Sequence, residues 1–192
     1  MAVLLNSTIA EPVGVEMAEI KISIRLTDRL VAYGLGACIG LCMYESKMRI
    51  AGLAHIVLPA ARQALRLTTS DKNPNVSPGK FADTAVERLI EEMQRYGGDV
   101  DNLRAAIVGG AHIFSGIGAI AQTSRLEIGT RNAAAVMEIL ERAGIPVAAA
   151  DIGGSHGRTV TLRVCDGGVY VKPIGSTETM LTSLGRVEKV VR

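Results

Sequence analysis

The stretch "GLGACIGLCMYE", residues 34–45, decides how this chain folds and raises its first chemical question. It has the composition of a buried strand that follows two glycines, Gly34 and Gly36. It also holds two of the three cysteines of the chain, Cys38 and Cys42. Each cysteine is either a small core residue or a nucleophile, and the surrounding sequence has to distinguish these two interpretations.

Strand and helix patterns follow one another on both sides of this stretch. Short apolar runs predict strands at residues 18–24, 29–36, 38–45, 49–59, 103–111, 147–154, 158–164 and 168–174. Apolar residues at helical spacing predict helices from Ser77 and Pro78 to the glycines at 97 and 98, and over residues 130–144. A polar segment at 62–79 is predicted to be a long loop. Together these patterns favour an α/β fold with mixed, hairpin-rich sheets.

Length and composition indicate one domain. A chain of 192 residues, of which 48% are hydrophobic, is long enough to build its own core. We expect an N-terminal extension at 1–17, the domain at 18–180 and a C-terminal tail at 181–192. Three cysteines are too few for a disulfide framework, which favours a reducing, cytoplasmic setting.

Charge and hydropathy exclude several classes of partner. The net charge is +2 with both signs interspersed, and the chain has no Trp and only two Phe, so nucleic acid is not an expected partner. The N-terminus lacks the basic start of a secretory signal, and no apolar run reaches about 18 residues. We therefore expect a soluble protein without membrane insertion.

The hairpin formed by the second pair of strands relates Cys38 to a histidine. If Ser46 and Lys47 are its two turn residues, Cys38 lies directly opposite His55. Opposed residues have Cβ atoms about 4.5 to 5.5 Å apart, close enough for a hydrogen bond between a thiol and an imidazole. A three-residue loop would place Ile56 opposite Cys38 instead.

This pair suits acyl-transfer chemistry. A free thiol has a pKa of about 8.5, so a nucleophilic cysteine needs a neighbouring imidazolium or local dipoles to hold its thiolate. The glycines before Cys38, Gly36 in particular, allow a bend that leaves the N–H groups near Ala37 and Cys38 free to stabilise an oxyanion. His55 is the candidate base.

Structural roles are the alternative for each of these residues. Cys42 and Cys165 have neither a glycine bend nor a histidine partner, so we expect both to be core residues. On spacing alone, Cys38 fits a core residue as well as a nucleophile, and His55 considered without Cys38 fits a core histidine better than a base.

The remaining candidates favour no ligand site. His112 and His156 are expected at loop edges, and histidines so widely separated predict no metal. The glycine pairs at 109–110 and 153–154 lack a phosphate-loop pattern and predict tight bends. We expect no cofactor.

From about residue 20 to 175 the chain resembles the CheD family, the chemoreceptor glutamine deamidases of bacterial and archaeal chemotaxis. The resemblance rests on several segments that occur in order: "GLGACIGLCMYE", "AGLAHIVLP", "GKFADTAVERLIEEM", "VGGAHIF", "IGTRNAAAV" and "DIGGSHGRTV". Each segment alone is weakly diagnostic, whereas the ordered set is specific.

The resemblance implies a fold, a reaction and partners. The fold would be a layered α/β sandwich similar to the deamidase domains of some bacterial toxins. Cys38 would be the nucleophile and His55 the base that keeps its thiolate, and the products would be glutamate and ammonia. The substrates would be glutamines on the cytoplasmic helices of methyl-accepting chemotaxis receptors. A second partner would be the phosphatase CheC, which acts on CheY.

Two positions depart from the family pattern. A threonine that supports the histidine usually stands six residues before the nucleophile, where this chain has Ala32. A serine usually precedes the nucleophile, where this chain has Ala37. These departures keep one alternative open, a weakly active or inactive regulator that binds CheC. The cysteine and histidine alone would also fit a thiol protease or amidase with other substrates, which has no family match.

Overall fold

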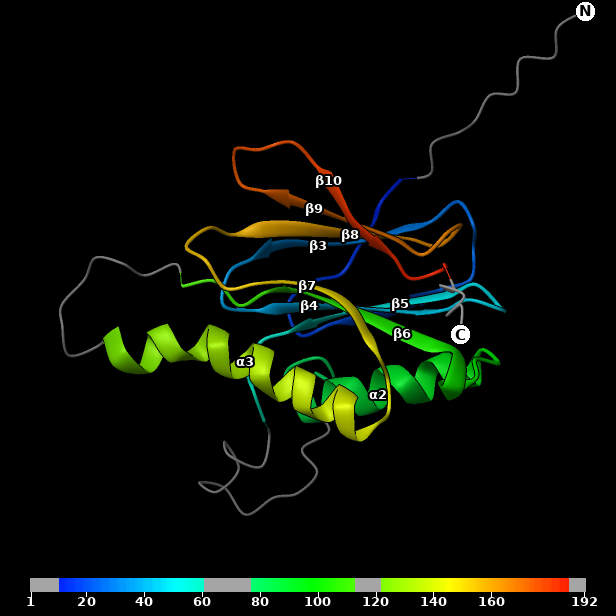
Figure 1. Ribbon diagram of the computed structural model, residues 1–192, viewed down its shortest axis with the longest axis horizontal. Helices are drawn as coiled ribbons and strands as arrows, with labels where there is room; N and C mark the ends of the chain where they lie inside the picture. Colours follow the sequence, from blue (N-terminus) through cyan, green and yellow to red (C-terminus); the bar gives the residue numbers. More distant parts are fainter. Residues whose placement is uncertain (1–10, 61–76, 113–121, 187–192) are drawn as a thin grey trace, which may run out of the picture.

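The computed structural model describes residues 11–60, 77–112 and 122–186, and in these ranges the chain forms three layers (Figure 1). The upper sheet contains, in spatial order, β1 (Val13–Gly14), β3 (Arg29–Leu35), β8 (Arg158–Arg163), β9 (Gly168–Pro173) and β10 (Thr179–Ser183). The middle sheet contains β2 (Ile20–Ser23), β5 (Ile50–Ile56), β4 (Ile39–Glu45), β6 (Leu103–Gly109) and β7 (Val147–Ile152). Helices α2 (Ala82–Arg95) and α3 (Gln122–Arg142) cover the free face of the middle sheet. The predicted layered α/β class is confirmed.

The quoted stretch forms the centre of the middle sheet. Every residue of β4 is buried, and β5 and β6 flank it. Ile39, Leu41 and Met43 face the helices, whereas Cys42 and Tyr44 face the upper sheet. A strand buried on both faces has a continuous apolar sequence, which is why this stretch lacks the alternation of a half-exposed strand.

Both helices differ from the prediction at their N-termini. Helix α2 begins at Ala82 rather than near Ser77, because Phe81 is extended and forms a bridge with Leu58 at the end of β5. Helix α3 begins at Gln122 rather than at 130, and Gly129 lies inside it. The start of α2 depends on this tertiary contact and has no side-chain capping hydrogen bond, so the sequence pattern missed it.

Two edge strands were not predicted. β1 pairs in parallel with β3, and β10 pairs with β9 through an irregular register.

The domain limits at 17 and 180 stay a prediction. Val15 and Leu184, which lie outside those limits, are both buried in the core between the sheets. Most of the loop predicted at 62–79 lies outside the described residues.

No helix in the described ranges is both long and apolar enough to cross a membrane.

Candidate active site

Cys38 lies in the bend that joins β3 to β4, at the end of the sandwich where β6 also ends. The carbonyl oxygens of Gly36, Ala37 and Cys38 accept hydrogen bonds from Ala111 N–H (2.7 Å), Asn132 Nδ2 (2.8 Å) and Gly110 N–H (2.9 Å), respectively. The N–H groups of Ala37 and Cys38 donate to none of the described residues. The bend therefore holds its carbonyls against the protein and leaves two donors available, as an oxyanion site requires.

The glycines around the bend are needed for its shape. Gly34, near the end of β3, adopts a positive φ of 64°, a conformation that favours glycine, and the bend follows directly. Gly109 also has a positive φ, and a Cβ there would overlap the carbonyl oxygen of Cys38. Positive φ angles at 109, 110, 153 and 154 confirm that both glycine pairs form tight bends.

The predicted hairpin register is wrong. Glu45 pairs with Ile50, so the loop contains four residues, and His55 lies opposite Gly40 instead of Cys38. The alternative register is also wrong, since Ile56 pairs with Ile39. The loop is longer because Glu45 Oε2 accepts the Met48 N–H at 2.6 Å and Arg49 adopts a left-handed φ of 56°.

Cys38 and His55 nevertheless face the same layer of the core. His55 alternates with Ala51 and Leu53, which face the upper sheet, and Cys38 packs against that same cluster. Cys38 precedes Gly40, the partner of His55, by two positions. Diagonal neighbours of this kind lie about 7 to 8 Å apart across a sheet. Among the described residues, no hydrogen bond joins the Cys38 thiol to the imidazole.

His55 is held in one orientation by Val15, in the segment between β1 and β2. Its side chain is buried at 4% exposure, and Nδ1 lies 3.3 Å from the carbonyl oxygen of Val15. A carbonyl oxygen only accepts, so Nδ1 carries the proton and Nε2 presents its lone pair. Nε2 has no hydrogen-bond partner in the described part of the chain. This is the tautomer that a general base for a thiol needs.

Burial favours the neutral forms of both groups. Burial lowers the pKa of His55, against the smaller opposing effect of the Val15 hydrogen bond. Burial also raises the pKa of the Cys38 thiol. Burial therefore disfavours both the thiolate of Cys38 and the imidazolium of His55, the charged pair that the sequence suggested.

The other cysteines differ in their surroundings. Cys42 is fully buried in the core between the sheets, as predicted, and burial raises its pKa far above that of a free thiol. Cys165 was also expected in the core, but it is only half-buried and lies 3.6 Å from Arg163 Nη2.

The other residues singled out in the sequence have different surroundings, and Ala32 belongs to the core cluster that Cys38 packs against. Ala32 is fully buried in β3, where it pairs with Val160. His112 is half-buried, with Nε2 3.4 Å from Thr130 Oγ1, and His156 is exposed, with Nδ1 3.1 Å from Ser155 Oγ. Only the second of these two histidines is as exposed as the sequence suggested.

Sequence reasoning missed Asn132, a fully buried residue of α3. Its amide donates to the carbonyl oxygens of Ala37 and Val57, at 2.8 and 2.9 Å. The sequence did contain a signal: Asn132 directly precedes the apolar run "AAAV" of a predicted helix. An asparagine is unusual on the buried face of a helix.

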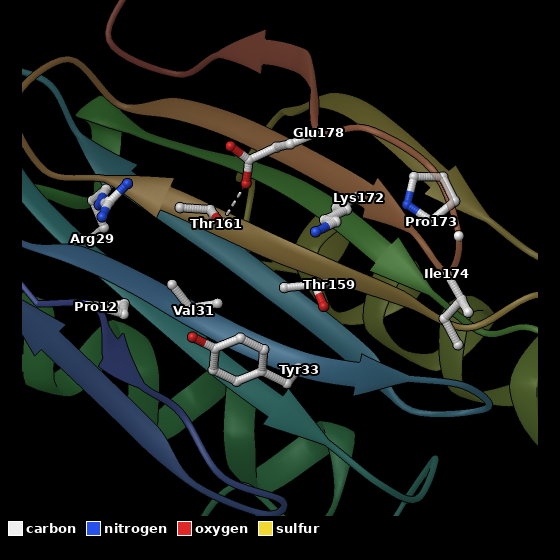
Figure 2. A pocket seen from close by; sticks show the side chains of 11 residues that line it. Pro12, Arg29, Val31, Tyr33, Thr159, Thr161, Lys172, Pro173, Ile174 and Glu178 are labelled. Atoms are coloured by element: carbon white, nitrogen blue, oxygen red, sulfur yellow. Dashed lines mark hydrogen bonds between the residues drawn. The ribbon is translucent and has the colours of Figure 1, made fainter.

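A groove of about 420 Å³ lies elsewhere, on the outer face of the upper sheet (Figure 2). Tyr33, Thr159 and Lys172 are among its lining side chains, and Glu178 accepts a hydrogen bond from Thr161 within it. Neither Cys38 nor His55 lines this groove. The candidate site is defined by its reactive groups and not by this depression.

The buried state of His55 predicts how stability depends on pH. Because its pKa is lowered in the folded state, the unfolded chain binds a proton that the folded chain does not as the pH falls below about 6.5. The free energy of unfolding should therefore fall from about pH 7 to about pH 5, and less so in His55→Gln. Urea unfolding of both proteins at the two pH values measures this difference. An equal fall in both proteins would contradict the assignment.

Comparison with known proteins identifies the family. Residues 58–173 match the family model described as CheD chemotactic sensory transduction. A protein named probable chemoreceptor glutamine deamidase CheD from Desulfitobacterium hafniense is 38% identical over 169 residues, which cover 88% of this chain and 98% of that protein. Proteins with the same name from Desulforamulus reducens and Clostridium acetobutylicum are 39% and 36% identical, over 78% and 77% of this chain and 83% and 82% of their own lengths. With more than half of its length matched by the family model, this chain belongs to the CheD family.

Proposed function

We propose that this protein deamidates glutamine side chains of chemotaxis receptors by a cysteine mechanism, with Cys38 as nucleophile and His55 as base. The observation that carries the proposal is the Nε2 of His55, which has no hydrogen-bond partner among the residues that the structure describes and lies on the same face of the middle sheet as Cys38. The relatives named probable chemoreceptor glutamine deamidase CheD support the substrate class.

The first half of the reaction forms a thioester. His55 Nε2 takes the proton of the Cys38 thiol while Sγ attacks the amide carbon of the glutamine side chain. The carbonyl oxygen becomes an oxyanion, and it is stabilised by the N–H groups of Ala37 and Cys38, which donate to no other group in the described ranges. The imidazolium then donates its proton to the amide nitrogen, the C–N bond breaks, and ammonia leaves.

The second half hydrolyses that thioester. Nε2 removes a proton from water as the water oxygen attacks the thioester carbon. The C–S bond breaks, and the proton returns from His55 to the Cys38 sulfur. Glutamate and the original neutral pair result. General-base catalysis from a neutral pair agrees with the directions in which burial moves the two pKa values.

The carbonyl of Val15 takes the supporting role that the resemblance gave to a threonine hydroxyl. It already accepts the Nδ1 proton of His55, so Ala32 removes no indispensable group. The hydrogen bond of a backbone carbonyl does not depend on a side chain, and this explains how the site tolerates alanine at position 32.

Ala32→Thr is therefore expected to leave turnover within about twofold of wild type, because the added hydroxyl provides no hydrogen bond that the site lacks. Its extra atoms at a fully buried position should lower the free energy of unfolding by about 1 to 3 kcal/mol. Initial rates of receptor deamidation, measured by mass spectrometry on both proteins, provide the comparison. A tenfold or larger gain would show that the missing hydroxyl limits the reaction.

The partners follow from the same proposal. The substrate is a glutamine on the cytoplasmic helices of a methyl-accepting receptor, which places this protein in the cytoplasm. A CheC-type phosphatase is the proposed second partner. The alternative function, a weakly active or inactive regulator of that phosphatase, rests on Ala32 in place of the family threonine.

One experiment separates these functions. Purified protein is incubated with a receptor fragment, and conversion of glutamine to glutamate is followed over time by mass spectrometry. Glutamate that appears with wild type and not with Cys38→Ala supports the deamidase. Binding of the receptor fragment without any conversion would favour the regulator.

A further inference from the structure

We propose that Asn132 of α3 is a positioning residue of this site, because its amide fixes the distance between the bend that carries Cys38 and the strand that carries His55. This inference rests on the proposed function and adds a residue from the helical layer to it.

The contacts of Asn132 lie on both sides of the reactive pair. Its Nδ2 donates to the carbonyl oxygen of Ala37, the residue before Cys38, at 2.8 Å. The same nitrogen donates to the carbonyl oxygen of Val57, two residues after His55, at 2.9 Å. Because both partners are acceptors only, the NH₂ end of the amide must face them. One side chain thus bridges the two segments.

The two hydrogen bonds of Asn132 reach Ala37 and Val57, which lie just beyond the end of the ladder between β4 and β5. The last pair of the ladder between β4 and β5 is Ile39 with Ile56. Beyond it, the chain turns into the bend on one side and toward residue 58 on the other. Cys38 lies one residue beyond this last pair, and within the described residues no hydrogen bond joins its thiol to His55. Asn132 replaces the missing ladder with two hydrogen bonds to backbone carbonyls.

Close packing of α3 allows the amide to reach this far. Gly129 precedes Asn132 by three positions, so both lie on one face of the helix. A Cβ at Gly129 would lie 2.5 Å from the carbonyl oxygen of Gly110. Gly110 in turn donates its N–H to the carbonyl of Cys38 at 2.9 Å. The helix backbone is therefore packed directly against the segment that holds the nucleophile.

The chemistry of Asn132 argues against a role in packing alone. Its Oδ1 is buried and has no hydrogen-bond partner among the described residues, which is unfavourable for stability. Its neighbours on the buried side of α3, Ala133 and Val136, are apolar. An amide at this position is explained by the two carbonyls that it holds.

The test compares Asn132→Ala and Asn132→Asp with Tyr44→Phe. Tyr44 is a matched control, since it is buried and its hydroxyl donates to the carbonyl of Val164 at 2.9 Å. We expect kcat for receptor deamidation to fall about 100-fold in both Asn132 variants, with KM within about threefold, because small displacements of reacting groups have effects of this size. Tyr44→Phe should lower the midpoint of thermal unfolding and keep kcat within about twofold.

A second readout does not depend on the receptor. The rate of alkylation of Cys38 by iodoacetamide is measured against pH by mass spectrometry, with Cys165 as internal reference. In wild type, His55 should accelerate alkylation near neutral pH, and this acceleration should be lost in both Asn132 variants and kept in Tyr44→Phe. The Cys165 rate should be unchanged in all of them.

Several results would overturn the proposal. The first is that kcat and the alkylation profile of the Asn132 variants equal those of wild type. The second is that both change only as much as they do in Tyr44→Phe. The third is that neither Asn132 variant folds although Tyr44→Phe does. If wild type and Cys38→Ala are equally inactive toward the receptor, the proposed function fails, and the alkylation profiles alone decide the role of Asn132.

Discussion

Cys38→Ala is expected to abolish deamidation of a receptor fragment. Without the Sγ nucleophile no thioester forms, and the loss should reach at least about 10⁴-fold in kcat, the size seen when a covalent nucleophile is removed. Folding should be little affected, because Cys38 lies in a half-buried bend whose hydrogen bonds come from backbone groups and Asn132. Initial rates by mass spectrometry, with circular dichroism as a check on folding, measure both effects.

The other cysteines provide matched controls. Cys165→Ala should retain most activity, since Cys165 contacts Arg163 and lies apart from His55. Cys42→Ala should lower stability because it opens space in a fully buried position, while kcat is largely retained. Equal losses of activity in all three alanine variants would refute the assignment of Cys38 as nucleophile.

The strands of the fold could be predicted because apolar periodicity records burial. The runs that form β3 to β6 and β7 to β9 are each apolar and bounded by turn residues, so their approximate limits follow from the sequence. The edge strands β1 and β10 are short and mostly held by backbone pairing, which leaves little trace in side-chain pattern. The N-terminus of α2 was missed for a similar reason, because the bridge between Phe81 and Leu58 sets it.

The register of the central hairpin shows the limit of turn chemistry. Ser46 and Lys47 are adjacent to a buried carboxylate, Glu45, whose oxygen holds the Met48 N–H. That side chain and the left-handed Arg49 extend the loop to four residues and shift every pair. Since both groups act through specific contacts, a rule based on loop length alone could not anticipate them. Cys38 and His55 share a face in spite of this shift.

Within the candidate site, the residues with reactive side chains were predictable and their supports were not. A cysteine after a glycine bend and a histidine on the next strand can be recognised from their chemistry. The carbonyl of Val15 has no sequence signal, because any residue could provide it. Asn132 is remote in sequence from both Ala37 and Val57, and only the packing of α3 brings them together.

These supports also change the expected state of the site at rest. A thiolate would need a positive neighbour, and the described surroundings of His55 are a carbonyl oxygen, apolar side chains and the charge of Glu16, whose effect on the pKa of His55 is smaller than that of burial. Burial disfavours charge on both groups, so in the proposed mechanism the charges separate only when substrate is bound. In that mechanism the proton moves from Cys38 to His55 during the attack, and we therefore expect the reaction to need His55 at neutral pH.

His55→Gln is therefore expected to give the second-largest loss. Removal of a general base typically lowers the rate by about 10² to 10⁴-fold, and KM should change little because the substrate contacts remain.

The pH profiles of wild type and His55→Gln should also differ in shape. In wild type the lowered pKa of His55 favours the neutral base at pH 7, so kcat should be nearly constant above about pH 6.5. In the variant the Cys38 thiol must ionise unaided, and burial raises its pKa, so kcat should keep increasing with pH to above about pH 9. Rates of receptor deamidation between these pH values measure both profiles, and His156→Gln, which alters an exposed histidine, is the control. A His55→Gln profile parallel to that of wild type would mean that another group accepts the thiol proton, because a lost base must change the shape of the profile and not only its height.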